Sequence, residues 1–155
     1  MNAVHTYNII HLDLKPENVL MEDEHSLIPW VTDFGLAASG LSNSFSNSAA
    51  GRGTLKYKAP ELFRTTKQGG ALLIPAADIY SFGILAWEVL TGAVPWADQV
   101  DTEIMMSVVN GERPELSDCK NWRAAKDPGV VALIDECLHQ DPGDRPSFAA
   151  IATRL

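Results

Sequence analysis

The sequence contains little cysteine, no excess of basic charge and no long apolar run free of charged residues. Its two cysteines, Cys119 and Cys137, are too few for a disulfide framework, and neither has the spacing of a metal ligand. We therefore expect two free thiols in a reducing compartment. The formal net charge of −8 argues against a nucleic-acid backbone or an anionic membrane as the main partner.

The sequence shows no pattern for secretion or membrane insertion. Its N-terminus has no basic segment followed by an apolar one. The most apolar stretch is residues 71–90. It includes Pro75, Asp78 and Glu88, which favours a buried helix of a soluble protein over a membrane span. These observations predict a cytoplasmic location and no membrane span.

The composition is typical of one globular domain. The 155 residues are 46% hydrophobic and 21% charged, which suffices for a core and argues against disorder of the whole chain. Residues 1–10 predict the end of a helix followed by a short strand. Apolar runs at 18–21 and 28–32, separated by the polar residues 22–26, predict a hairpin. Residues 36–56 have no period and predict a long loop.

The second half of the chain predicts helices, the longest at residues 76–91. This segment is apolar on nearly every face, which is typical of a helix that is buried all round. Pro75 suits its first turn, and Gly92 suits its end.

Three shorter helices are expected after it. One covers residues 101–110 and stops at Gly111, the next begins at Asp127 and Pro128, and Ser147 caps the last. The apolar side chains predicted to face the core are Ile104, Met105, Val108 and Val109 in the first, and Val130, Val131, Ile134, Cys137 and Leu138 in the second.

Five short motifs follow one another along the chain. Each alone is weak evidence, because a motif of a few residues can arise by chance. They are HLDLKPEN at 11–18, DFG at 33–35, GTLKYKAPE at 53–61, DIYSFG at 78–83 and DPGDRPSF at 141–148. In order and spacing the set resembles the C-terminal lobe of eukaryotic protein kinases, over nearly all 155 residues.

The resemblance implies a fold class and a division of the chain. The expected fold is mainly α with a small β hairpin, as in the helical C-terminal lobe of the protein-kinase-like fold. Residues 1–155 would be a partial kinase domain, truncated at its start. Its parts would be a catalytic loop at 11–18, an activation segment at 33–61 and a helical subdomain at 62–155.

The resemblance also implies a role for individual residues in phosphoryl transfer from ATP. Asp13 would orient the attacking hydroxyl and accept its proton, and Lys15 would neutralise the transferred phosphate. Asn18 and Asp33 would bind Mg²⁺, for which their oxygens are suitable ligands. Leu20 would lie under the adenine ring. The alternatives are a turn or capping role for each polar residue and an ordinary strand-core role for Leu20.

Two positions indicate the substrate. Lys15 and Thr54 resemble the pair typical of kinases that act on Ser and Thr hydroxyls, and the stretch 78–96 is similar to the tyrosine-kinase-like group of these enzymes. The implied partner is therefore a protein substrate phosphorylated on Ser or Thr.

Other matches predict structural contacts. Glu61 and Arg145 resemble a buried ion pair of the family, and Asp78 resembles the residue that holds the catalytic-loop backbone. Leu12 departs from the family pattern, in which Arg is usual. That Arg meets a phosphate on the activation segment, and Leu12 has neither the charge nor the donors to do so.

Only ten residues precede His11, whereas the family also has an N-terminal lobe with a Gly-rich loop, a strand Lys, its partner Glu and an adenine-binding hinge. Three hypotheses follow. The chain is the catalytic lobe of a kinase completed by another lobe and inactive alone, a non-catalytic docking module derived from a kinase, or an unrelated helical scaffold. A truncated start also predicts an uncovered apolar surface beside helix 76–91.

Overall fold

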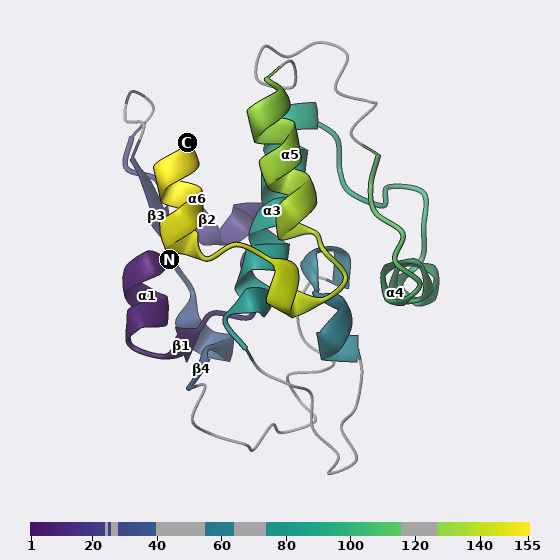
Figure 1. The fold of residues 1–155 in the computed structure, drawn as a ribbon, viewed down its shortest axis with the longest axis horizontal. Coiled ribbons are helices and arrows are strands. Elements are labelled where there is room, and N and C mark those ends of the chain that lie inside the picture. The colour runs from purple at the N-terminus through teal and green to yellow at the C-terminus, as the bar shows by residue number, and fades with distance from the viewer. Residues whose placement is uncertain (24, 26–27, 40–54, 64–73, 116–126) are drawn as a thin grey trace.

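The computed structural model describes residues 1–23, 25, 28–39, 55–63, 74–115 and 127–155. Thr54, Cys119 and most of the loop expected at 36–56 lie outside the described residues. The described part is mainly helical, with two small antiparallel sheets near its N-terminus (Figure 1). The fold class expected from the sequence is therefore confirmed.

The predicted hairpin is present. Strand β2 (Val19–Met21) pairs antiparallel with β3 (Pro29–Val31), and Leu20 lies opposite Trp30. The helix end and the short strand predicted for residues 1–10 are also present. They are α1 (Asn2–Thr6) and β1 (Ile9–Ile10).

A second strand pair was not expected. Strand β4 (Ala38–Ser39) pairs antiparallel with β1, with Ile10 opposite Ala38. Two-residue strands are too short to show a period of two in the sequence, so only the tertiary structure brings them together. The assignment of residues 36–56 as loop throughout is therefore wrong at 38–39.

The four predicted helices of the second half are present with nearly the predicted bounds. They are α3 (Ala76–Thr91), α4 (Asp101–Val109), α5 (Pro128–Cys137) and α6 (Phe148–Arg154). Gly92 follows α3 with a φ of 67°, a left-handed conformation that suits glycine. The side chain of Asp127 accepts from the Gly129 amide at 2.8 Å, and Ser147 Oγ accepts from the Ala150 amide at 3.2 Å.

Short 3₁₀ turns complete the described part. They are η1 (Pro16–Asn18), η2 (Phe34–Leu36), η3 (Leu55–Tyr57), η4 (Pro60–Phe63) and η7 (Pro142–Asp144).

Helix α3 lies at the centre, with α5 packed along it (Figure 1). One core cluster joins α3 to α4, η3 and η4, and a second joins α3 to α5, α6 and the loop before η1. Leu14, which is 2% exposed, anchors that loop in the second cluster. Burying a leucine this fully stabilises the folded state by about 1.5–3 kcal/mol. The contacts of Leu14 therefore hold the loop with the first motif against the core.

Two expectations about helix faces are wrong. Helix α3 is not buried all round, because Val89 is 63% exposed. In α4, the exposed fraction is 39% for Met105 but 0% for Ile104 and Val108, and Ser107 completes the buried stripe. A helix that packs on one side buries a single stripe, and the sequence does not fix where the centre of that stripe lies.

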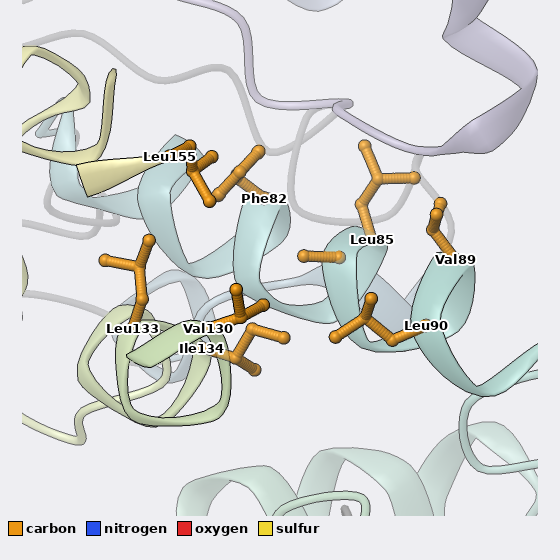
Figure 2. A pocket seen from close by; sticks show the side chains of 9 residues that line it. Phe82, Leu85, Val89, Leu90, Val130, Leu133, Ile134 and Leu155 are labelled. Carbon is orange, nitrogen blue, oxygen red and sulfur yellow. The ribbon is translucent and has the colours of Figure 1, made fainter. Parts of the chain in front are cut away.

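The uncovered side of α3 borders an apolar cavity of about 260 Å³. Figure 2 shows the side chains that line it, which come from α3, α5 and the C-terminal residue. An apolar surface therefore lies beside helix 76–91, between α3, α5 and the C-terminal residue, and its origin in a truncated start stays a prediction. The lining residues are Phe82, Leu85, Ala86, Val89, Leu90, Val130, Leu133, Ile134 and Leu155. In the part of the chain that the structure describes, no helix has the length and apolar character needed to cross a membrane.

Candidate active site

The carboxylate of Asp78 in helix α3 binds the backbone of the loop at 11–18. Asp78 is completely buried, and its Oδ2 and Oδ1 accept from the backbone amides of His11 and Leu12, each at 2.8 Å. Asp78 lies in the first turn of α3, where the helix dipole favours a negative charge. The predicted role of Asp78 in holding this backbone is confirmed.

Leu12 has a strained backbone. Its φ is 66°, in the left-handed region that costs a non-glycine residue about 1–2 kcal/mol. The hydrogen bond from its amide to Asp78 offsets this cost, and its side chain packs against the core cluster that contains Tyr57 and Leu62. An apolar side chain at this position is therefore used for packing.

His11 connects this loop to the segment after β3. Its Nε2 lies 2.9 Å from the Thr32 carbonyl, which only accepts, so Nε2 carries the hydrogen. Its Nδ1 accepts from the Asp13 amide at 3.3 Å. The ring also meets Phe34 edge to face at 4.8 Å. One buried imidazole thus couples Asp13 to the Asp33-Phe34-Gly35 motif.

Three of the candidate residues meet around one oxygen atom. Asp13 Oδ2 lies 2.9 Å from Lys15 Nζ and accepts from Asn18 Nδ2 at 3.0 Å. The same Asn18 nitrogen donates to the Asp13 carbonyl at 2.7 Å. Since Asn18 Nδ2 faces Asp13, its Oδ1 faces the other way and is oriented as an acceptor or a cation ligand.

Asn18 is in turn tied to the segment that carries Asp33. The Thr32 amide donates to the Asn18 carbonyl at 2.9 Å, next to the last strand pair of the hairpin. Asp33 is exposed, has a φ of 59°, and accepts from the Gly35 amide through Oδ1 at 3.1 Å. The hairpin therefore brings the Asn18 amide and the Asp33 carboxylate to the same end of its two strands.

The metal-binding capacity of this site is limited to a few protein ligands. Among the described residues, no group of three or more His, Cys, Asp or Glu side chains is placed to hold a metal ion. One carboxylate and one amide oxygen suit Mg²⁺, which usually keeps several waters and binds substrate phosphates as well.

Leu20 lies on the open face of the hairpin. It is 53% exposed, and its neighbours Met21 and Trp30 are 51% and 57% exposed. The reading of Leu20 as an ordinary core residue is therefore wrong for this structure. Leu20 and Trp30 are paired across the two strands, so their side chains lie on the same face of the hairpin and give it an exposed apolar surface.

The segment at 55–63 is anchored to α3 by side chains that the sequence did not single out. Tyr57 donates a short hydrogen bond to Glu88, and its carbonyl accepts from Ser81 Oγ at 2.8 Å. Burial and the neighbouring Glu88 raise the pKa of the Tyr57 phenol well above its ordinary value. Glu88 and Ser81 lie seven residues apart on α3, two helical turns, which is the signal that could have identified them.

The predicted ion pair between Glu61 and Arg145 is confirmed. Both side chains are buried, and Arg145 Nη1 and Nη2 donate to the two Glu61 oxygens at 2.7 and 2.8 Å. This pair fixes η4 against the segment before α6.

Comparison with known proteins agrees with this architecture. The model of the protein kinase domain family matches residues 1–154. The chain is 39% identical to receptor-interacting serine/threonine-protein kinase 4 of Mus musculus over 99% of its length, which is 20% of that relative. It is 34% identical to ankyrin repeat and protein kinase domain-containing protein 1 of Mus musculus, over 98% of this chain and 20% of the relative. It is 35% identical to serine/threonine-protein kinase STY17 of Arabidopsis thaliana, over 100% of this chain and 25% of the relative.

The chain belongs to the protein kinase family. The hypothesis of an unrelated helical scaffold is therefore wrong. The chain spans about a fifth to a quarter of the length of these relatives.

Proposed function

We propose that this chain is the catalytic lobe of a kinase that transfers the γ-phosphoryl group of ATP to Ser or Thr hydroxyls of a protein substrate. The observation that supports the proposal is that Lys15 Nζ and Asn18 Nδ2 both contact Asp13 Oδ2. A carboxylate held between a cation and an amide has a fixed direction, which a positioned general base requires.

Each residue of the cluster has a distinct task in this proposal. Asp13 orients the substrate hydroxyl and takes its proton. Lys15 supplies positive charge for the oxygens of the transferred phosphoryl group, where negative charge is spread in the transition state. The Asn18 amide oxygen and the Asp33 carboxylate hold Mg²⁺, which neutralises the ATP phosphates. Leu20, exposed on β2, contacts the adenine ring.

The proposal divides the chain as the sequence suggested. Residues 11–18 form the catalytic loop, residues 33–61 the activation segment and residues 62–155 the helical subdomain. The Gly-rich loop, strand Lys and hinge of a kinase are not found among these 155 residues. We therefore expect them on a second lobe that completes the nucleotide site from the open side of the β2–β3 hairpin.

The test begins with the coding sequence directly upstream of Met1, where we expect a Gly-rich loop and a strand Lys. The encoded protein is then assayed with labelled ATP, Mg²⁺ and a generic protein substrate. Asp13→Asn should lower the transfer rate by roughly 10²–10⁴-fold, because it removes the base. Asp98→Asn, which changes an exposed carboxylate elsewhere, is the matched control and should leave the rate unchanged.

Labelling of Ser and Thr, but not Tyr, would support the substrate class. Equal activity of Asp13→Asn and the unmodified protein would contradict the proposal and favour a docking module without catalysis.

A further inference from the structure

Lys58 is a half-buried cation that the proposed mechanism does not use. It belongs to the segment at 55–63 and directly follows Tyr57. Its Nζ lies 5.6 Å from the centroid of the Phe63 ring, in a cation–π contact. An ammonium group that has lost part of its water gains more from a nearby anion than a fully hydrated one does.

The backbone around Lys58 is firmly held. The Lys58 amide donates to the Leu55 carbonyl at 3.1 Å, which closes η3. Tyr57 before it is anchored to α3, and Ala59 and Pro60 after it are buried. A side chain on a fixed backbone loses less conformational freedom when it binds a ligand, so Lys58 is suited to recognition.

Lys58 lies near the loop that carries Asp13. Leu12 packs against the core cluster that contains Tyr57, so Asp13 and Lys58, the residues that follow these two, lie on neighbouring segments. Burial lowers the pKa of Lys58 and the negative charge of Asp13 raises it, which places the ammonium group within electrostatic reach of that carboxylate. A peptide whose hydroxyl is oriented by Asp13 therefore brings its flanking residues close to Lys58.

The charge of the whole chain makes a local cation informative. With a formal net charge of −8, the chain as a whole repels an acidic peptide. A preference for an acidic peptide must therefore come from a local positive charge. Lys15, whose Nζ lies 2.9 Å from Asp13 Oδ2, is assigned to the transferred phosphoryl group, whereas Lys58 has no part in that step.

We propose that Lys58 is a specificity-determining residue that binds an anionic side chain one or two residues from the Ser or Thr that receives the phosphate. The anion is the carboxylate of Asp or Glu, or the phosphate of a residue that was phosphorylated beforehand. Successive residues of an extended peptide lie about 3.3–3.6 Å apart, so two residues on either side of the hydroxyl remain close to Asp13. The inference rests on the proposed function, because it takes the hydroxyl to be positioned by Asp13.

The first measurement is peptide binding to the 155-residue chain, followed by fluorescence anisotropy. Each labelled peptide has one Ser in an Ala background, with Ala, Glu or phosphoserine at one position within two residues of that Ser. At one or two of these positions the Glu peptide should bind roughly five-fold or more tightly than the Ala peptide. A gain for phosphoserine alone would support the proposal and identify a previously phosphorylated substrate.

Variants of Lys58 test whether it is the cation that binds the anion. Lys58→Met removes the charge and should abolish the preference, Lys58→Arg should keep it, and Lys58→Glu should reverse it in favour of a peptide with Lys at that position. Lys56→Met is the matched control and should keep the preference. It removes the same charge from η3, two residues earlier, and side chains two residues apart in a 3₁₀ turn point in different directions.

The second measurement is kinetic, on the active kinase. The ratio of kcat/KM for the Glu peptide to that for the Ala peptide should be roughly five or more in the unmodified protein and about one in Lys58→Met. Equal binding of the Glu, phosphoserine and Ala peptides, or no binding of any, would overturn the inference. A preference that survives in Lys58→Met, or that Lys56→Met abolishes as well, would also overturn it. If the unmodified protein transfers no phosphate, the proposed function fails while the binding measurement still decides the role of Lys58.

Discussion

Arg145 joins Glu61 through both of its terminal nitrogens, at 2.7 and 2.8 Å, and also lies over the ring of Tyr80 with 5.2 Å between Cζ and the ring centroid. The two ends of the ion pair are 84 residues apart. Since Tyr80 belongs to α3, this contact ties η4 and the segment before α6 to the central helix.

Breaking this pair should destabilise the fold strongly. Glu61→Gln leaves the buried Arg145 charge without its counter-charge, and the free energy of unfolding should fall by about 3–5 kcal/mol. Urea unfolding measures the change. The control is Glu136→Gln, which breaks an exposed pair with Arg154 and should cost much less. Equal losses for the two variants would contradict a special role for the buried pair.

Cys137 should be unreactive in the folded protein. It is completely buried, and burial raises the pKa of its thiol from 9.0 to about 12. Alkylation at pH 8, followed by peptide mass spectrometry, should label Cys137 only after unfolding. Rapid labelling of the native chain at this residue would contradict the burial.

The same thiol should make the fold less stable in alkali. The unfolded thiol loses its proton near pH 9.0 and the folded one near pH 12, so the folded state binds more protons between these values and its stability falls as pH rises. Unfolding free energies of the unmodified chain and of Cys137→Ala, measured from pH 8 to pH 11, give this contribution as a difference in slope. Identical slopes would exclude it.

The 155-residue chain alone should transfer no phosphate at a useful rate. Positioning supplies most of the catalysis in phosphoryl transfer, and the proposed ligands Asp33 and Asn18 alone would position a nucleotide poorly. Incubation with labelled ATP, Mg²⁺ and a protein substrate should give no label above a buffer blank. Clear incorporation that disappears in Asp33→Ala would overturn this prediction.

The apolar cavity beside α3 should promote association of the isolated chain. Its lining includes Val89, which is 63% exposed, and uncovered apolar surface of this kind favours contact with other molecules. Light scattering should detect oligomers of the unmodified chain and fewer of Val89→Lys. Val94→Lys is the control, because Val94 is 52% exposed but does not line the cavity. A monodisperse monomer before any substitution would refute the expectation.

From Leu12 we predict that the activity of the kinase does not depend on phosphorylation of its activation segment. The side chain packs against the core and offers no charge to a phosphate. The kcat of the active enzyme should therefore be similar before and after phosphatase treatment, with Asp13→Asn as the inactive control. A large drop that rephosphorylation reverses would show that another cation performs the task of the usual Arg.

The sequence by itself determined the local structure. Helix ends depend on nearby residues, so Gly92, Asp127 and Ser147 marked them correctly. The hairpin followed from two apolar runs around a polar turn. The ordered set of five motifs, the first of which contains Asp13, Lys15 and Asn18, indicated the family because the residues of each motif are close in the sequence.

The tertiary structure decided which distant residues meet. The donation from His5 to Asp78 and the pairing of β1 with β4 each join segments far apart in the chain, and no local pattern encodes them. The same holds for the exposed side of α3, since a helix that is apolar on nearly every face does not show which face its neighbours leave open. The neighbours of α3 decide this, because Ile84 is buried in the cluster with residues of α4, η3, η4 and α5, whereas Val89 is left 63% exposed.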